Sequence, residues 1–252
     1  MRVIALGFFD GAHKGHARLF EKTRQRAGEM GASPSVITYS AHPSSVLSET
    51  PKKLINTAAE RMYLIRSVYG IEDIIVKDFT PEFAALSAEE FVRNLLISEC
   101  GAVSVVAGYD FRFGKNGEGN AETLLSLCEK YKIGCDIEEE VRVGGVKASS
   151  TLIRELIASG DVEEAERFLG HKHTIIGKVA HGRKLGSKIG FPTVNIPFDE
   201  NVVVPKFGVY AARVRTGEQV FRAVANIGVR PTVASGAAPR LDSAYGSSPL
   251  LP

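Results

Sequence analysis

The chain has 252 residues, of which 44% are apolar and 24% charged, and its formal net charge is +2. These values are typical of a soluble globular protein with one large domain or a large and a small one, and they exclude a disordered chain. So small a net charge gives no support to a nucleic-acid-binding surface.

No signal peptide is recognisable at the N-terminus, and no apolar run reaches the length needed to span a membrane. The three cysteines, Cys100, Cys128 and Cys135, have no CxxC spacing and form an odd set, which argues against a zinc site and a disulfide framework. We therefore expect a cytoplasmic protein that binds neither membrane nor nucleic acid. The sequence does not indicate its oligomeric state.

The first two-thirds of the chain alternates short β-branched runs with helical patterns, which predicts a doubly wound, Rossmann-like α/β domain. The predicted strands are Val3–Leu6, Ser35–Tyr39, Asp73–Val76, Val103–Ala107 and Cys135–Glu138. Capping boxes predict helix starts at Thr57 with Glu60 and at Ser87 with Glu90. Gly160 can end one helix and Asp161 can start the next, so we place the first domain at residues 1–169.

From His173 the pattern changes to short β runs separated by glycine and proline, which predicts a small β-barrel at residues 170–240. The predicted strands are Thr174–Ala180, Gly208–Val214 and Val220–Ala225. Residues 241–252 show no strand or helix periodicity and are predicted to be a disordered or foreign tail.

The segment from Gly7 to His16 leaves a predicted strand and enters a helix expected to begin near His16. In an open parallel sheet ligands bind beyond the carboxyl ends of the strands, and glycines at positions 7, 11 and 15 let the backbone approach a ligand closely. His13 and His16 lie three residues apart, so on a helix both can donate to one polyphosphate, and Lys14 adds positive charge. The segment predicts a phosphate site at a helix N-terminus.

Other interpretations of this histidine pair are chance, a structural pair and a metal site. The metal site is disfavoured because no third ligand cluster accompanies the pair. Neither a Walker lysine motif nor the glycine-spaced dinucleotide fingerprint is present. Two roles stay open for Asp10, which can help to hold Mg²⁺ or brace the turn.

A second phosphate-binding motif is predicted at residues 149–154. Ser149, Ser150 and Thr151 can cap a helix and direct hydroxyl groups and amides at a phosphate, and Arg154 follows one turn later. An ordinary capped helix is the alternative interpretation.

The run Gly7-Phe8-Phe9-Asp10-Gly11-Ala12-His13-Lys14-Gly15-His16 resembles the signature of the HxGH nucleotidyltransferases, in the form found in bacterial bifunctional riboflavin kinase/FAD synthetases. Three further segments agree with that family in order and spacing: His42-Pro43, Gly108–Gly114 and Ser149–Arg154. The sequence departs from the family at Phe8, where asparagine is frequent, and at Tyr39-Ser40-Ala41 before His42.

The resemblance implies an FMN adenylyltransferase that uses ATP and Mg²⁺. The phosphate of FMN would attack the α-phosphorus of ATP in line and release pyrophosphate, with no protein nucleophile.

The resemblance also implies which residues contact the substrates. Catalytic phosphate contacts are implied for His13, His16 and Arg154. Further ATP or phosphate contacts are implied for Gly7, Phe9, Asp10, Gly15, Ser149, Ser150 and Thr151. Flavin contacts are implied for His42, Pro43, Asp110, Phe111, Arg112 and Phe113. Phe111 and Phe113 are expected to alternate about a strand end, with one of them in the core.

The second part of the chain resembles a riboflavin kinase barrel on the segments Gly177–Gly182, Gly186, Gly190–Asn195, Gly208–Tyr210 and Asn226–Thr232. This resemblance implies Mg-ATP contacts at Gly186, Thr193 and Asn195, with Thr193 and Asn195 as the metal ligands.

In that family a catalytic glutamate and further strands follow. Asp242 stands roughly at the glutamate position, but the residues after it do not match. We expect an incomplete barrel in which Asp242, the candidate kinase base, is poorly positioned, so that riboflavin phosphorylation is lost or impaired while FMN adenylylation survives.

Two other functions stay open. One is an HxGH nucleotidyltransferase with a different phosphorylated acceptor, and the other is a flavin-binding or regulatory module without turnover.

Overall fold

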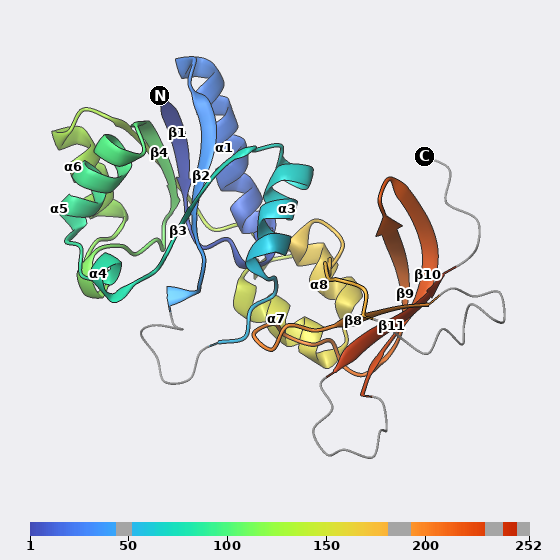
Figure 1. Ribbon diagram of the computed structural model, residues 1–252. Helices are drawn as coiled ribbons and strands as arrows, with labels where there is room; N and C mark the ends of the chain where they lie inside the picture. The colour runs from blue at the N-terminus through green and yellow to red at the C-terminus, as the bar shows by residue number, and fades with distance from the viewer. Residues whose placement is uncertain (44–51, 181–192, 230–238, 246–252) are drawn as a thin grey trace.

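The computed structural model describes residues 1–43, 52–180, 193–229 and 239–245, and the chain is built on two different sheets (Figure 1). The first is a five-stranded parallel sheet and the second a four-stranded antiparallel sheet. The predicted doubly wound α/β unit followed by a small β unit is therefore confirmed.

The parallel sheet has the strand order β3-β2-β1-β4-β5. Its strands are β1 (Arg2–Leu6), β2 (Ser33–Tyr39), β3 (Asp73–Lys77), β4 (Ala102–Gly108) and β5 (Gly134–Glu138). Each of the five predicted strands lies within one of them, so these predictions are confirmed. The order reverses between β1 and β4, which is the switch point where such sheets bind ligands.

Helices connect these strands, and further helices follow the last of them. They are η1 (Asp10–Ala12), α1 (Lys14–Met30), α3 (Ala58–Tyr69), α4 (Pro81–Ala84), α5 (Ala88–Glu90), the π-helix η2 (Phe91–Glu99), η3 (Lys115–Gly117), α6 (Ala121–Lys130), α7 (Ser150–Ser159) and α8 (Val162–Leu169). A short hairpin of β6 (Arg142–Val143) and β7 (Val146–Lys147) precedes α7. Both predicted capping boxes form, and Gly160 ends α7 in a left-handed conformation, as predicted.

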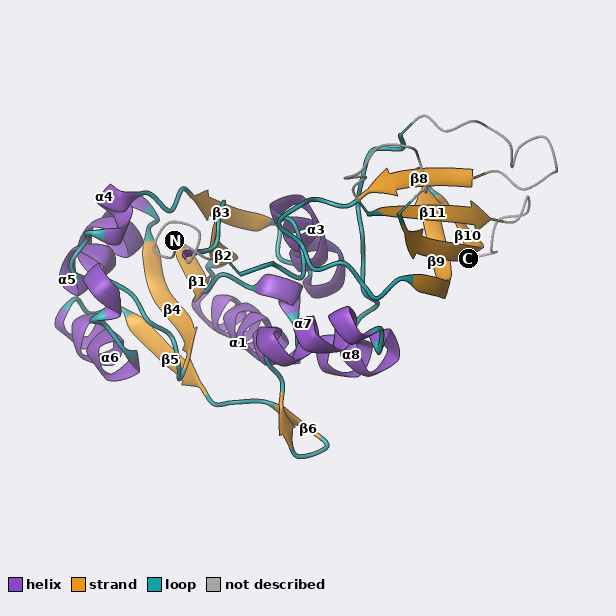
Figure 2. Cartoon of the chain, turned by 90° about the horizontal axis from the view of Figure 1, so that it is seen from below, coloured by secondary structure: helices purple, strands orange, loops and turns teal. Residues whose placement is uncertain are grey.

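The parallel sheet is buried on both faces because side chains alternate along each strand. Ile4 and Leu6 of β1 pack in the cluster that includes η2 and α6, whereas Val3 and Ala5 pack in the cluster that includes α1 and α3. Figure 2 shows α4, α5 and α6 on one side of the sheet and α1 on the other. This packing leaves the carboxyl edge of the sheet to the loops that follow β1, β2 and β4.

The antiparallel sheet has the order β8-β11-β10-β9, with β8 (Thr193–Pro197), β9 (Gly208–Thr216), β10 (Gln219–Gly228) and β11 (Arg240–Tyr245). Strands at Gly208–Val214 and Val220–Ala225 were predicted and are confirmed. In β10 the buried residues Ala223, Ala225 and Ile227 alternate with exposed ones, which is typical of a sheet with one covered face.

The predicted strand at Thr174–Ala180 is wrong. Two backbone groups of this segment bond to side chains of the first unit, and within the described residues only the Ala180 amide is seen to donate to the neighbouring strand β8, at the Asn195 carbonyl oxygen (2.8 Å). Glu60 accepts from the Ile176 amide at 2.6 Å, and the Asn56 side chain donates to the Thr174 carbonyl oxygen at 3.3 Å.

The prediction of an unstructured tail at residues 241–252 is also wrong for residues 241–245, which belong to β11. This strand lies between β8 and β10 and pairs with both, so backbone hydrogen bonds hold it although its side chains show little apolar alternation. Ser243 in its middle is fully buried. Residues 246–252 lie outside the described part of the chain.

The two units contact each other through backbone groups. Leu54 donates to the Asn201 carbonyl oxygen and accepts from the Val203 amide, both at 2.7 Å. The Lys206 amide donates to the carbonyl oxygen of Ile157 at the end of α7. These contacts place the segment before α3 between the parallel sheet and the antiparallel sheet.

Candidate active site

The loop after β1 has an unusual backbone. Phe9 and Ala12 have φ angles of 62° and 41°, although neither is glycine, and Gly11 has a φ of 79°. Left-handed conformations at such residues are strained and are typical of functional sites. A Cβ atom on Gly11 would also lie 2.7 Å from Ile55 Cδ1, so a glycine is required at that position.

His13 caps the N-terminus of α1, which begins at Lys14, two residues before the expected start. Its Nδ1 accepts a hydrogen bond from the Gly15 amide at 3.1 Å. In the neutral ring this leaves the proton on Nε2, which is therefore a donor. A Cβ atom at position 15 would lie 2.9 Å from His13 Cε1, so the glycine makes room for the ring.

The rings of His13 and His16 stack at a centroid distance of 3.7 Å, which agrees with the shared face that their spacing predicted. Burial lowers the pKa of His13 to about 4 and lowers the pKa of His16 well below its usual value. Phe9 packs beneath them, with its ring edge-on to His16 at 5.2 Å and almost fully buried. Both imidazoles are therefore neutral at pH 7 and can donate hydrogen bonds without carrying charge.

Asp10 braces the loop. Its Oδ1 accepts from the amides of Ile55 at 2.9 Å and Asn56 at 3.3 Å, and its backbone oxygen accepts from the Ser150 hydroxyl at 2.9 Å. Its Oδ2 lies 3.5 Å from Arg154 Nε. Burial raises the pKa of this carboxyl, against the effect of the two amide bonds and the arginine. These contacts fit the bracing role, and a role in holding Mg²⁺ stays a prediction.

Helix α7 brings the second predicted motif to the same place. Ser149 caps the helix by accepting from the Leu152 amide at 3.4 Å, Thr151 is exposed and Arg154 reaches Asp10. The structure therefore brings together the residues at positions 149–154 and the loop after β1, which lie about 140 positions apart, as in the bond from Ser150 to Asp10.

The loops after β2 and β4 contribute the predicted flavin residues. His42 stands edge-on to Phe8 at 4.7 Å, and Arg154 lies close enough to help lower the His42 pKa, although burial is the main cause. Asp110 forms an ion pair with Lys147 at 3.2 Å and acts electrostatically on His13. The structure therefore brings His42 and Asp110 to the carboxyl edge on which the histidine pair lies.

Phe111 and Phe113 do not alternate as expected. Their rings stack at 5.6 Å with an interplanar angle of 13°, and both contact Phe91 of the π-helix. Phe113 belongs to the core, as expected for one of the two, while Phe111 is partly exposed. Arg112 between them is exposed, and Pro43 is partly exposed. Flavin contacts from these residues stay predictions.

Two residues at the site were missed by the sequence analysis. Arg61 of α3 is 1% exposed, donates to the Tyr39 carbonyl oxygen at 2.5 Å and lies over the Phe8 ring at 4.1 Å. Asn56, before α3, is also buried and donates its amide to Asp10. A signal for Arg61 was available, because helical periodicity puts it on the same face as Leu64 and Ile65.

In the second sheet, strand register brings two predicted kinase residues together. Asn195 of β8 lies directly opposite Asp242 of β11, and Thr193 lies two residues earlier in β8. Asn195 is buried and Asp242 is partly exposed. The expectation that the segment around Asp242 is not held in place is wrong, since β11 is paired on both sides, while the role of Asp242 as kinase base stays a prediction. Gly186 lies outside the described residues.

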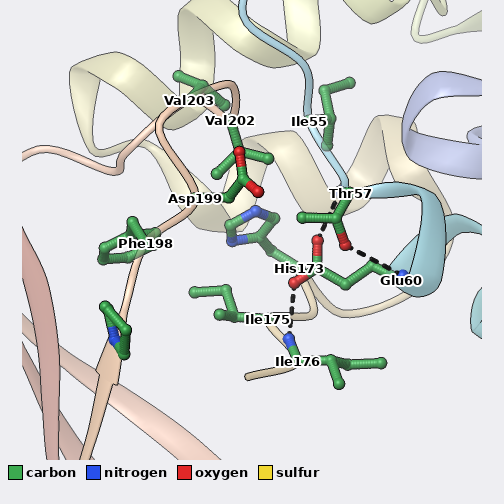
Figure 3. A pocket seen from close by; sticks show the side chains of 11 residues that line it. Ile55, Thr57, Glu60, His173, Ile175, Ile176, Phe198, Asp199, Val202 and Val203 are labelled. Atoms are coloured by element: carbon green, nitrogen blue, oxygen red, sulfur yellow. Dashed lines mark hydrogen bonds between the residues drawn. The ribbon is translucent and has the colours of Figure 1, made fainter. Parts of the chain in front are cut away.

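A cavity of about 300 Å³ opens where the two units meet, and none of the predicted site residues in the described part of the chain lines it (Figure 3). Its walls come from the segment before α3, from α3 and from residues after α8 and β8. They include Ile55, Glu60, His173, Phe198 and Val202. Burial lowers the pKa of His173 to about 4.

Within the described ranges, no three histidine, cysteine or acidic side chains gather as ligands for a metal ion. Over the same ranges, the search for a helix with the length and apolar character of a membrane span finds none.

The parallel sheet, its histidine loop at the switch point and the converging N-terminus of α7 define an α/β nucleotidyltransferase unit, joined to a β unit. Residues 1–152 match the family model of FAD synthetase, and residues 169–242 match that of riboflavin kinase. The chain belongs to the family of bifunctional riboflavin kinase/FMN adenylyltransferases.

Curated relatives that carry this family name cover most of the chain. The Listeria monocytogenes protein is 38% identical over 237 residues, which are 92% of this chain and 73% of the relative. The Bacillus subtilis protein is 38% identical over 91% of this chain and 72% of the relative. The Escherichia coli K12 protein is 34% identical over 92% of this chain and 74% of the relative.

A solved structure from Streptococcus pneumoniae, named a macrolide-efflux protein, aligns with a TM-score of 0.83 and 31% sequence identity. The alignment covers 98% of this chain and 80% of the other, so the similarity of fold extends over both sheets.

Proposed function

We propose that this chain transfers the adenylyl group of ATP to FMN and so produces FAD and pyrophosphate. The observation that carries the proposal is the meeting of His13, His16 and Arg154 at one edge of the sheet, beside His42 and Asp110. The first three suit a polyphosphate, and the last two lie where an acceptor would approach.

In this reaction an oxygen of the FMN phosphate attacks the α-phosphorus of ATP. The bond between that phosphorus and the oxygen bridging to the β-phosphate breaks, and pyrophosphate leaves with the electron pair. The attacking phosphate is already ionised at neutral pH, so the protein needs no general base, and pre-aimed donors supply the stabilisation. The low pKa values of His13 and His16 suit them to donate while neutral, and Arg154 supplies positive charge.

Mg²⁺ is expected to bind mainly through ATP oxygens and water, since this ion seldom needs a complete protein cage. Asp10 Oδ2 has no hydrogen-bond partner among the described residues, although Arg154 Nε lies 3.5 Å away, and it is the carboxylate oxygen of the loop that would contact the ion. Bound there, the metal would neutralise phosphate charge. The protein contributes the loop shape and the hydrogen-bond donors.

The test is to incubate the purified chain with FMN, ATP and Mg²⁺ and to follow FAD and pyrophosphate by chromatography. Turnover to FAD is the expected result. Pyrophosphate release with a different phosphorylated acceptor, but not with FMN, would favour the general HxGH nucleotidyltransferase. Tight flavin binding without pyrophosphate release would favour the regulatory module.

Riboflavin phosphorylation is a second candidate activity, favoured by the position of Asn195 opposite Asp242. Transfer of phosphate to a hydroxyl benefits from a carboxylate that orients the hydroxyl and accepts its proton. Aspartate is one methylene shorter than the glutamate of the family, so we propose that this activity is impaired in the 252-residue chain. Supplying riboflavin, ATP and Mg²⁺ tests this directly, because FMN formation at a rate comparable to FAD formation would contradict it.

A further inference from the structure

Unpaired buried polar atoms gather around the loop after β1. Among the described residues, those without a hydrogen bond include His16 Nδ1, Asn56 Oδ1 and both Nε and Nη1 of Arg61. Asp10 Oδ2 and Arg154 Nε also lack a hydrogen bond, but they form an ion pair with each other at 3.5 Å. Buried polar groups in folded proteins are normally hydrogen-bonded, so a group of unpaired ones in one place requires an explanation. A site that binds a polar ligand provides one.

Among these side chains, Arg61 has the most polar atoms without a hydrogen-bond partner. Its guanidinium is buried against Phe8 and donates from Nη2 to the Tyr39 carbonyl oxygen, but two of its nitrogens have no acceptor within the described part of the chain. Burial lowers the pKa of Arg61 to about 10, which still leaves it charged at neutral pH. A buried cation with unpaired donors destabilises a fold unless an anion binds it.

The nearby carboxylate of Asp10 does not form an ion pair with Arg61 and so does not serve as this anion. It acts electrostatically on Arg61, but its Oδ1 is occupied by the amides of Ile55 and Asn56, and its Oδ2 lies next to Arg154. Among the described residues, no ion pair joins Arg61 to an acidic side chain. The positive charge of Arg61 is therefore not neutralised by an acidic side chain of the described residues.

The position of Arg61 indicates which ligand this is. Phe8, beneath its guanidinium, contacts His42 at 4.7 Å, and Arg61 lies close enough to His42 and His16 to help lower the pKa of each. Arg61 thus lies between the residue expected to contact flavin and a histidine expected to contact ATP. The group of the acceptor that must reach this point is its phosphate.

We propose that Arg61 binds the phosphate of FMN and holds it against the α-phosphate of ATP. Two anionic substrates must approach each other here, and the two neutral histidines donate hydrogen bonds without offsetting that repulsion. Arg154 is paired with Asp10, so Arg61 supplies a further positive charge on the acceptor side. This assignment rests on the proposed FMN adenylyltransferase function.

The experiment compares Arg61→Gln with Arg61→Lys and with a matched control, Arg66→Gln. Arg66 is in the same helix, but its side chain is 46% exposed and faces Glu72 at the surface. For each variant the KM for FMN, the KM for ATP and kcat are measured from FAD formation. The inhibition constant of lumiflavin, a flavin ring without a ribityl phosphate, reports the ring site separately.

Arg61→Gln is expected to raise the KM for FMN by about 10- to 100-fold, the range for one lost hydrogen bond to a charged group. The KM for ATP and the lumiflavin inhibition constant should stay near the wild-type values. Arg61→Lys keeps the cation and should recover part of the loss, while Arg66→Gln should behave as wild type. Circular dichroism melting verifies that each variant is folded, and if Arg61→Gln is not, the same comparison is made with Arg61→Lys.

Three results would overturn the proposal, and they are distinguishable. Wild-type protein that makes no FAD rejects the proposed function and the assignment together. Wild-type turnover with an unchanged KM for FMN in the folded Arg61 variants rejects the assignment alone. Equal weakening of FMN and lumiflavin shows that Arg61 shapes the flavin pocket instead of binding the phosphate.

Discussion

The two nucleotide sites expected in this chain are held in different ways. At the first, the loop after β1 has a left-handed backbone at Phe9 and Ala12, and groups from distant parts of the chain hold it in place. At the second, the register of two neighbouring antiparallel strands puts Asn195 opposite Asp242.

This difference determines how each site should respond to mutation. A strained loop keeps its shape only while its long-range contacts survive, whereas a strand pair holds residue positions through backbone hydrogen bonds that every residue type except proline can donate. Substitutions that disturb the loop of the first site should therefore lower activity by displacing its catalytic side chains. At the second site they should act through the length and charge of a single side chain.

The largest effect is expected for His16→Ala. Loss of one pre-aimed donor typically raises a reaction barrier by about 2.7–4 kcal/mol, so kcat for FAD formation should fall by about 100- to 1000-fold. The KM for FMN should change little, because the donor acts on charge that develops in the transition state. Gln25→Ala, on the exposed side of the same helix, is the control. A normal turnover rate in His16→Ala would reject this role.

A pair of glycines in α1 tests whether geometry limits the first site. A Cβ atom on Gly15 would lie 2.9 Å from the His13 ring, whereas a Cβ atom on Gly28 meets nothing within 4 Å. Gly15→Ala should displace the ring and lower turnover by about 100-fold, since a 1 Å misplacement can have that effect.

Gly28→Ala should leave turnover unchanged and raise the free energy of unfolding by about 0.5–1 kcal/mol, because alanine is the better helix former. FAD formation rates and urea unfolding curves measure the two effects. If both variants kept full activity, the first site would be more tolerant of distortion than its strained backbone implies.

At the second site, Asp242→Glu should raise FMN formation from riboflavin by about tenfold, as the longer side chain recovers part of the reach lost with aspartate. Asp242→Asn should abolish this activity, because an amide accepts no proton. FAD formation from FMN, measured in the same samples, should not change in either variant. Equal riboflavin kinase rates in Asp242→Asn and the wild type would exclude Asp242 as the base.

The smallest expected effect is a pH dependence of the free energy of unfolding, caused by His173 at the junction of the two units. Burial holds the pKa of His173 at about 4, below the usual value of 6.5. As the pH falls from about 6.5 to about 4, the unfolded chain binds a proton that the native chain does not, so stability is lost over this range. His13 acts in the same direction, while the raised pKa of Asp10 acts against it.

The variant His173→Leu isolates this contribution. The slope of its unfolding free energy against pH should be smaller than that of the wild type, by at most about 1.4 kcal/mol per pH unit for one proton. Urea unfolding between pH 5 and pH 8 measures it, and the two slopes should agree above pH 7, where both proteins have a neutral group. Equal slopes below pH 6 would show that His173 titrates normally.

Local patterns in the sequence determined much of the first unit. The five parallel strands follow from β-branched runs, and the capping boxes at Thr57 and Ser87 need only residues three positions apart. The three-residue spacing of His13 and His16 also predicted that they share a face, and their stacking agrees with this although His13 is the N-cap and precedes the helix. Such features depend on near neighbours in the chain, and so sequence reasoning finds them.

Tertiary structure decided the rest. The segment Thr174–Ala180 has the β-branched residues of a strand, yet Glu60 and Asn56 of the first unit bond to two of its backbone groups and it forms no strand. The segment Arg240–Tyr245 lacks a strand pattern but becomes β11, since both of its edges are paired. Strand formation depends on which partners are available, and local sequence does not encode those partners.

The same reason applies to the candidate site. The sequence indicated the loop after β1 and the motif at residues 149–154, but only the fold brings Ser150 and Arg154 onto Asp10. Arg61 looked like an ordinary residue of an amphipathic helix. Its burial against Phe8 with two unpaired nitrogens comes from the packing of α3 against the loops after β1 and β2, which are contacts between segments far apart in the chain.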